Sequence, residues 1–141
     1  MTGKRRGKTT YDKKVIRGDD MLDERYYEGF EGEGQVTIWC DEDGMVIWSG
    51  YFETILEGCW RSDFSHDGIV KCYHNRDGFF DGVWEMQYPH IVLDELDKFD
   101  EKLLNTDSKG MIEKSKEVIS QLVSFINGAI ENKRRIYVEY D

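Results

Sequence analysis

The stretch VTIWCDEDGMVIWSGYF, residues 36–52, decides the fold that the sequence predicts. Apolar and other side chains alternate through residues 36–40, and an apolar, β-branched and aromatic run resumes at residues 45–52. The polar segment between them, residues 41–44, ends in an Asp-Gly pair of the kind that closes tight turns. The stretch therefore predicts a β-hairpin.

The turn chemistry also predicts a register for this hairpin. A three-residue loop with Gly44 in the left-handed conformation places Cys40 opposite Val46 and Ile38 opposite Trp48. These four side chains would then share one face of the sheet, which we expect to be the buried face.

Two similar turn signals follow the hairpin. An Asp-Gly pair ends residues 65–68, and another ends residues 75–78, between a β-branched run at 69–74 and an aromatic run at 79–86. The spacing predicts a meander of at least four antiparallel strands. The cross-strand partners that it predicts are His74 with Phe80 and Val70 with Trp84.

After residue 88 the hydrophobic period changes from that of a strand to that of a helix. Pro89 suits the first turn of a helix, whose apolar positions recur at helical spacing up to residue 103. A longer helical stripe covers residues 111–130, where Gly128 suggests close packing, and residues 136–140 alternate as a final strand.

The predicted fold class is therefore α+β. We expect an antiparallel sheet, made of the meander and the C-terminal strand, with two helices packed on one face. The side chains expected to meet in the core are Ile38, Trp48, Val70, Trp84, Val118, Leu122 and Phe125.

Charge divides the 141 residues into two parts. The chain has 19 Lys and Arg against 29 Asp and Glu, a net charge of −10, yet residues 1–17 carry seven basic side chains and one acid. We expect residues 1–17 to form a basic arm, either solvated and flexible or able to bind phosphate, and residues 18–141 to form a single domain. The acidic balance argues against a general nucleic-acid binder, so no direct nucleic-acid contact is expected.

The sequence shows no membrane span and no secretory signal, so we expect a cytoplasmic protein without membrane contact. An odd number of cysteines in apolar surroundings predicts reduced, buried thiols. The three are Cys40, Cys59 and Cys72.

Catalytic and metal-binding patterns are not found. No CxxC or HxxxH motif is present, and nothing places a thiol beside a cation or a helix N-terminus. A calcium loop that starts at Asp41 would need Glu at its twelfth position, which is Phe52. We therefore expect no enzyme, no metal and no cofactor, although an enzyme of unrecognised type is a less favoured alternative.

Acidic side chains interleaved with aromatic ones are the feature that points to a function. Aromatic residues inside a charged rim are how tight protein interfaces concentrate binding energy, and acidic surfaces attract basic partners. The partner-binding residues that we expect are Tyr26, Tyr27, Phe30, Trp39, Asp41, Glu42, Asp43, Tyr51, Asp94, Glu95, Asp97 and Asp100.

A small, acidic, cysteine-poor α+β chain with Trp39, the acids of residues 41–43, Trp48 and Tyr51 on a hairpin resembles the immunity proteins of bacterial polymorphic and contact-dependent toxin systems. The resemblance covers residues 25–141 in overall character, and the basic arm departs from it. It implies an inhibitor that binds a cognate toxin, often a basic nuclease, and occludes its active site or substrate surface. The alternative from the residues is a structural or adaptor domain; either protein would be a monomer or a homodimer.

Overall fold

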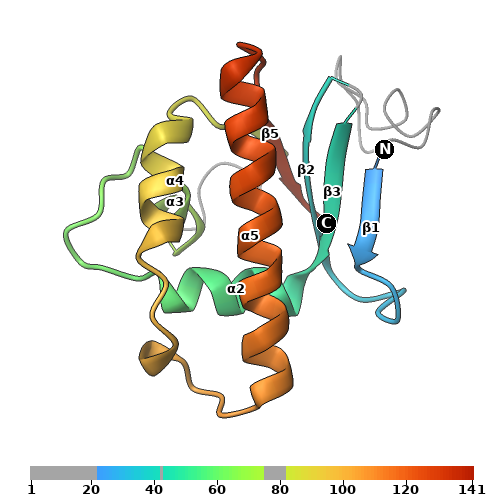
Figure 1. The fold of residues 1–141 in the computed structure, drawn as a ribbon, viewed down its shortest axis with the longest axis vertical. Helices are drawn as coiled ribbons and strands as arrows, with labels where there is room; N and C mark the ends of the chain where they lie inside the picture. The colour runs from blue at the N-terminus through green and yellow to red at the C-terminus, as the bar shows by residue number, and fades with distance from the viewer. Residues whose placement is uncertain (1–21, 42, 75–81) are drawn as a thin grey trace.

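The computed structural model of the chain describes residues 22–41, 43–74 and 82–141. These residues form an α+β fold with a five-stranded sheet in the order β1-β3-β2-β5-β4, four α-helices and a short 3-10 helix, η2 (Figure 1). The elements are β1 (Leu22–Tyr26), β2 (Gln35–Cys40), β3 (Asp43–Trp48), α2 (Ser49–Gly58), α3 (Ile69–His74), β4 (Val83–Glu85), α4 (Pro89–Asp97), η2 (Glu101–Leu103), α5 (Lys109–Glu131) and β5 (Tyr137–Tyr140).

The sheet is mixed, which corrects the purely antiparallel sheet expected from the sequence. β2 pairs antiparallel with β3 and with β5, and β4 pairs antiparallel with β5, but β1 pairs parallel with β3. β3 lies between β1 and β2, the two strands that precede it in the chain. The sequence contains no turn signal for the pairing of β1 with β3, because β2 separates these two strands in the chain.

The β2–β3 hairpin forms as predicted, but in a different register. Cys40 pairs with Asp43, and Ile38 pairs with Met45 instead of Trp48. Gly44 lies inside β3 opposite Trp39, where an added Cβ would come 2.7 Å from the Ile38 carbonyl oxygen. Gly44 is therefore needed for close strand approach and not for a left-handed turn.

A register change of three residues exchanges the two faces of β3. Met45 and Ile47 point into the core with Ile38, whereas Trp48 lies outside the buried core cluster. The placement of Trp48 in the core was therefore wrong.

The apolar run after β3 is a helix where the sequence predicted a continued strand. β3 ends at Trp48, and α2 starts at Ser49. The buried side chains of α2 and the residue after it are Phe52, Ile55, Leu56 and Cys59, spaced as on one helical face.

Residues 69–74 form α3, which corrects the predicted second hairpin. Ile69 and Val70 donate their backbone N–H groups to Glu95 on α4, so these β-branched residues begin a short helix. Trp84 pairs with Val138 of β5 instead of Val70. Phe80, the predicted partner of His74, lies outside the described residues.

The C-terminal half follows the sequence more closely. α4 begins with Pro89, and the Ser108 side chain caps α5 by accepting a hydrogen bond from the Met111 N–H at 3.3 Å. β5 follows α5 as predicted. A Cβ at Gly128 would meet no atom within 4 Å, so the suggestion of close packing there was wrong.

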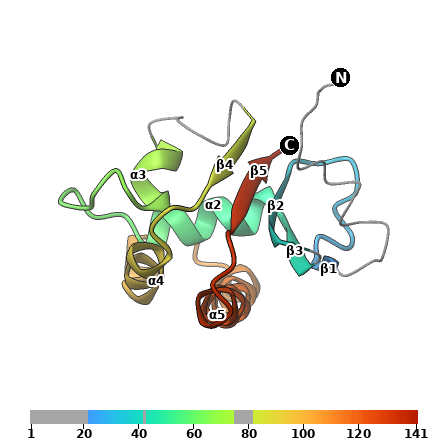
Figure 2. The same cartoon turned by 90° about the horizontal axis from the view of Figure 1, so that it is seen from above.

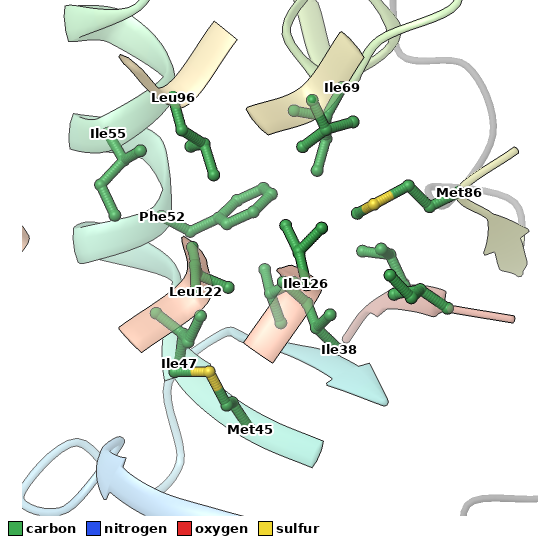
Figure 3. Packing of buried hydrophobic residues seen from close by; sticks show 14 of the residues in the cluster. Ile38, Met45, Ile47, Phe52, Ile55, Ile69, Met86, Leu96, Leu122 and Ile126 are labelled. Atoms are coloured by element: carbon green, nitrogen blue, oxygen red, sulfur yellow. The ribbon is translucent and has the colours of Figure 1, made fainter. Parts of the chain in front are cut away.

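The core lies between the sheet and the helices. Helices α2 and α5 cross each other beside the sheet, and α3 and α4 lie at one end of the molecule (Figures 1 and 2). Phe52 of α2 and Leu122 and Ile126 of α5 gather with residues of the sheet, α3 and α4 (Figure 3). Of the expected core residues, Ile38, Val70, Val118 and Leu122 are buried, and Trp84 and Phe125 are half-buried against the cluster.

Two further sequence predictions concern membrane contact and the basic arm. In residues 22–41, 43–74 and 82–141, no helix combines the length and apolarity that a membrane crossing requires. The basic arm, residues 1–17, lies outside the described residues.

Candidate protein-binding surface

Three aromatic rings meet where the β1–β2 loop, the end of β3 and the start of α2 come together. The rings of Phe30 and Trp48 stack with centroids 3.9 Å apart and planes 6° apart. Tyr51 stands edge-on to both, with centroids 5.7 Å from Phe30 and 5.1 Å from Trp48. All three side chains are half-buried. We call Phe30, Trp48 and Tyr51 the aromatic cluster.

Trp48 is fixed from two further sides. Its indole Nε1 donates a hydrogen bond to Glu33 Oε1 at 2.9 Å. The ring also lies against the backbone of Gly50, where an added Cβ would overlap the six-membered part of the indole. The Trp48 ring is therefore held before any partner arrives, which lowers the entropic cost of using it in an interface.

The β1–β2 loop has its own internal support. Gly29 and Gly32 have φ of +91° and +94°, a region that strongly favours glycine. The Tyr27 hydroxyl donates to the Glu33 carbonyl oxygen at 2.9 Å and accepts from the Gly32 N–H at 3.2 Å. The loop thus holds Phe30 over Trp48.

The segment of the chain that carries the aromatic cluster is strongly acidic. Residues 22–58 contain ten acidic side chains and a single basic one, Arg25. Arg25 is already paired with Asp23, its Nη2 lying 2.6 Å from Asp23 Oδ2, and this guanidinium lowers the pKa of the Asp23 carboxyl. Glu33, which bonds Trp48, is exposed, and so is Glu53 of α2, whose Oε2 accepts a hydrogen bond from the Tyr140 hydroxyl at 2.8 Å.

A hollow of about 390 Å³ lies beside this loop, and its lining includes Thr37 of β2 and Val46 of β3, which are outside the buried core cluster. We call it the acidic hollow. Its lining residues are Leu22, Glu24, Tyr27, Glu28, Glu31, Gln35, Thr37 and Val46.

The structure brings three of the sequence-predicted residues together. Phe30 and Tyr51 are members of the aromatic cluster, and Tyr27 holds the loop and lines the acidic hollow. Two residues of this surface were not among those predicted. Trp48 had been assigned to the core, and Glu33 was not singled out among its acidic neighbours.

Three predicted partner-binding residues are buried. Tyr26 is covered, and its hydroxyl donates to Glu117 Oε2 at 3.0 Å. Burial is the main cause that raises the Tyr26 pKa to about 12. Trp39 is only 2% exposed and lies against Tyr137, with ring centroids 5.7 Å apart. The expectation that Trp39 is a surface residue was therefore wrong.

Glu95 is the third buried residue. It is 1% exposed, although the sequence predicts it to be a partner-binding residue. Its Oε1 accepts from the N–H groups of Ile69 at 2.8 Å and Val70 at 3.3 Å, and its Oε2 has no hydrogen-bond partner among the described residues. Burial raises the pKa of this carboxyl despite the two hydrogen bonds.

The remaining predicted acids are exposed or half-buried but lie apart from the aromatic cluster. Asp41 and Asp43 are at the other end of β3 from Trp48, roughly 16 Å away along the strand. Asp41 pairs with Arg134 at 3.0 Å. Glu42 lies outside the described residues. The other three, on α4 or just after it, are Asp94, Asp97 and Asp100.

Metal-ligand clusters and thiols are two kinds of chemical group that the described residues allow us to assess. Within residues 22–41, 43–74 and 82–141, no three His, Cys, Asp or Glu side chains are arranged to hold a metal ion. Cys40, Cys59 and Cys72 are buried, as predicted. Burial raises the pKa of Cys59 to about 12 and also raises that of Cys40, which disfavours the nucleophilic thiolate in both.

What the arrangement offers is a preformed aromatic surface with carboxylates around it and an adjacent acidic hollow. Comparison of the chain with protein-family models, curated proteins and solved structures finds no match in any of the three.

Proposed function

We propose that the chain is a binding protein that neutralises a basic protein partner, most specifically an immunity protein that occludes the active site or substrate surface of a toxin domain. The observation that carries the proposal is the aromatic cluster: Trp48 is held by Phe30, Glu33 and Gly50 within a segment that has ten acids and one base.

The aromatic and the acidic side chains make different contributions to binding. Aromatic residues that are rigid before binding contribute contact area at a small entropic cost, and such residues are frequent among the energetic centres of interfaces. Carboxylates around them raise the association rate of a basic partner and oppose acidic competitors. The mechanism is steric and electrostatic occlusion, without chemistry by the inhibitor itself.

The three buried thiols suit a reducing compartment, so the proposal places the protein in the cytoplasm. The most specific partner to test is the product of the reading frame next to the one that encodes this chain. That product should be basic, and its expression alone should arrest growth.

The deciding experiment co-expresses this neighbouring product with the wild-type chain, with Trp48→Ala and with Trp60→Ala. Trp60 is a matched control, because it is an exposed tryptophan at the other end of α2. We expect the wild type and Trp60→Ala to restore growth. Trp48→Ala should speed dissociation about 30-fold, as for loss of a central aromatic contact worth about 2 kcal/mol.

Binding kinetics at two salt concentrations test the electrostatic part. Reversing Asp41 and Asp43 to Lys should slow association at low salt about tenfold and leave dissociation nearly unchanged, because these acids lie away from the aromatic cluster. Association and dissociation rates that stay unchanged in both sets of substitutions would contradict the proposal. So would an acidic partner bound through residues 1–17.

A further inference from the structure

The acidic hollow has a neutral floor and a charged rim. Its floor includes Thr37 and Val46, which are 1% and 5% exposed. Its rim carries Glu24, Glu28 and Glu31, all of which are exposed. Among the residues that the structure describes, those that line the hollow include no basic side chain.

This layering fits one kind of ligand group, a long side chain with an apolar stem and a cationic end. Such side chains bury their methylene groups against apolar surface and keep the charge at the rim. The three carboxylates would accept hydrogen bonds from the cationic end. Arg25, the nearest base in sequence, is held by Asp23 through three side-chain hydrogen bonds and so is already engaged away from these three carboxylates.

The Tyr27 ring favours arginine over lysine. Its hydroxyl is fixed by the Glu33 carbonyl and the Gly32 N–H, so the ring forms a rigid wall of the hollow. A planar guanidinium can stack on an aromatic ring and bind a carboxylate through two parallel hydrogen bonds, which an ammonium cannot do.

We propose that the acidic hollow receives an arginine side chain of the basic partner, beside the aromatic cluster. This inference rests on the proposed function and adds the chemistry of one contact to it. The two sites are coupled through the β1–β2 loop, because Glu33 joins Tyr27 through its carbonyl and Trp48 through its carboxylate.

The test uses the full chain and a blocked five-residue peptide with a central arginine. The matched control peptide carries citrulline, which has nearly the same shape and no charge, and a third peptide carries lysine. Binding is followed by NMR through the backbone amides of Thr37 and Val46, the floor of the hollow. We expect saturable shifts with the arginine peptide and affinity about tenfold weaker for the other two.

Protein variants distinguish the effect of the carboxylates at the hollow from the effect of the overall negative charge. Glu28→Gln with Glu31→Gln should weaken the arginine peptide about tenfold. Glu113→Gln with Glu131→Gln removes the same charge from exposed positions on α5 and should have almost no effect. Both double variants keep side-chain oxygens that can accept the hydrogen bonds of the wild type.

Three results would overturn the inference: equal weakening by both double variants, unmoved amides at Thr37 and Val46, or equal binding of the citrulline peptide. A gain in peptide affinity when Lys4, Arg5 and Arg6 are changed to Gln would also overturn it, since the chain's own arm would then be the occupant. If Glu28→Gln with Glu31→Gln leaves peptide binding unchanged while the wild-type chain still rescues growth, the proposed function stands and this inference fails. Peptide binding without any rescue would refute the toxin partner instead.

Discussion

The indole Nε1 of Trp48 and Oε1 of Glu33 lie 2.9 Å apart, and their hydrogen bond ties the end of β3 to the β1–β2 loop. The same carboxylate therefore orients an aromatic side chain and supplies part of the negative charge around it. These two roles can be separated by substitution.

Glu33→Gln keeps an oxygen that can accept the hydrogen bond but removes the charge, whereas Glu33→Ala removes both. We expect the NMR resonance of the Trp48 indole N–H to stay near its wild-type position in Glu33→Gln and to move in Glu33→Ala. Because the site is exposed, the free energy of unfolding should fall by about 1 kcal/mol or less in either variant. An indole resonance that is the same in all three proteins would contradict the orienting role.

Gly50→Ala should destabilise the protein, although alanine is normally the better helix former. The new Cβ would overlap the Trp48 ring, and overpacking of this kind costs about 1–3 kcal/mol. Gly128→Ala in α5 is the control, because the new Cβ would meet no atom within 4 Å. This substitution should raise the free energy of unfolding by up to about 1 kcal/mol. Urea unfolding of both variants measures the contrast. Stabilisation by both would show that the Trp48 ring does not lie against Gly50.

Gly44→Ala tests the register of the β2–β3 hairpin. The added Cβ would come 2.7 Å from the Ile38 carbonyl oxygen and 2.8 Å from Trp39 Cβ, so the strands would have to separate. We expect the free energy of unfolding to fall by about 1–3 kcal/mol. In the wild type, NMR contacts across the hairpin should join Ile38 to Met45; contacts from Ile38 to Trp48 would support the three-residue loop instead.

Glu95 makes the stability of the protein depend on pH. Burial raises its pKa in the folded state above the ordinary value of 4.5, so the native protein binds this proton more tightly than the unfolded chain does. Above the raised pKa the ionised carboxylate lowers stability, and the loss is recovered as the pH falls toward 4.5. The stability difference between wild type and Glu95→Gln should therefore shift in favour of the wild type over that range.

Urea unfolding at several pH values between 4.5 and neutrality measures this difference. Asp97→Asn, at an exposed position of the same helix, serves as the control and should follow the wild type. A constant gap between wild type and Glu95→Gln across the range would contradict the shifted pKa.

Helices α4 and α5 and strand β5 were predictable because their signals are local. Pro89 marks the start of α4, the stripe of α5 is long, and Ser108 is a favoured cap. The error at Trp48 was of another kind. Apart from Ser49 and Gly50, the run from Met45 to Phe52 is apolar and aromatic, and residues beyond it, Ile55 and Leu56, are needed to reveal the helical period.

Contacts between residues far apart in the chain determine two features that the sequence does not predict, the helix at residues 69–74 and the aromatic residues of the candidate surface. Ile69 and Val70 have side chains typical of strands, yet their N–H groups meet the Glu95 carboxylate, which lies 25 residues or more away in the chain. The acids of the candidate surface were predictable as a group. Which aromatic residues join them depended on the hairpin register, since a shift of three residues turned Trp48 outward.

The place of β1 at the edge of the sheet also bears on how the fold opens. Among the described strands β1 pairs with β3 alone, whereas β2 pairs on both sides, with β3 and β5. An edge strand is expected to detach before a central one, so the amides of β1 should exchange with solvent sooner than those of β2. β1 and the loop that follows it form one wall of the acidic hollow, so a partner bound there would hold the edge of the sheet in place and slow its opening.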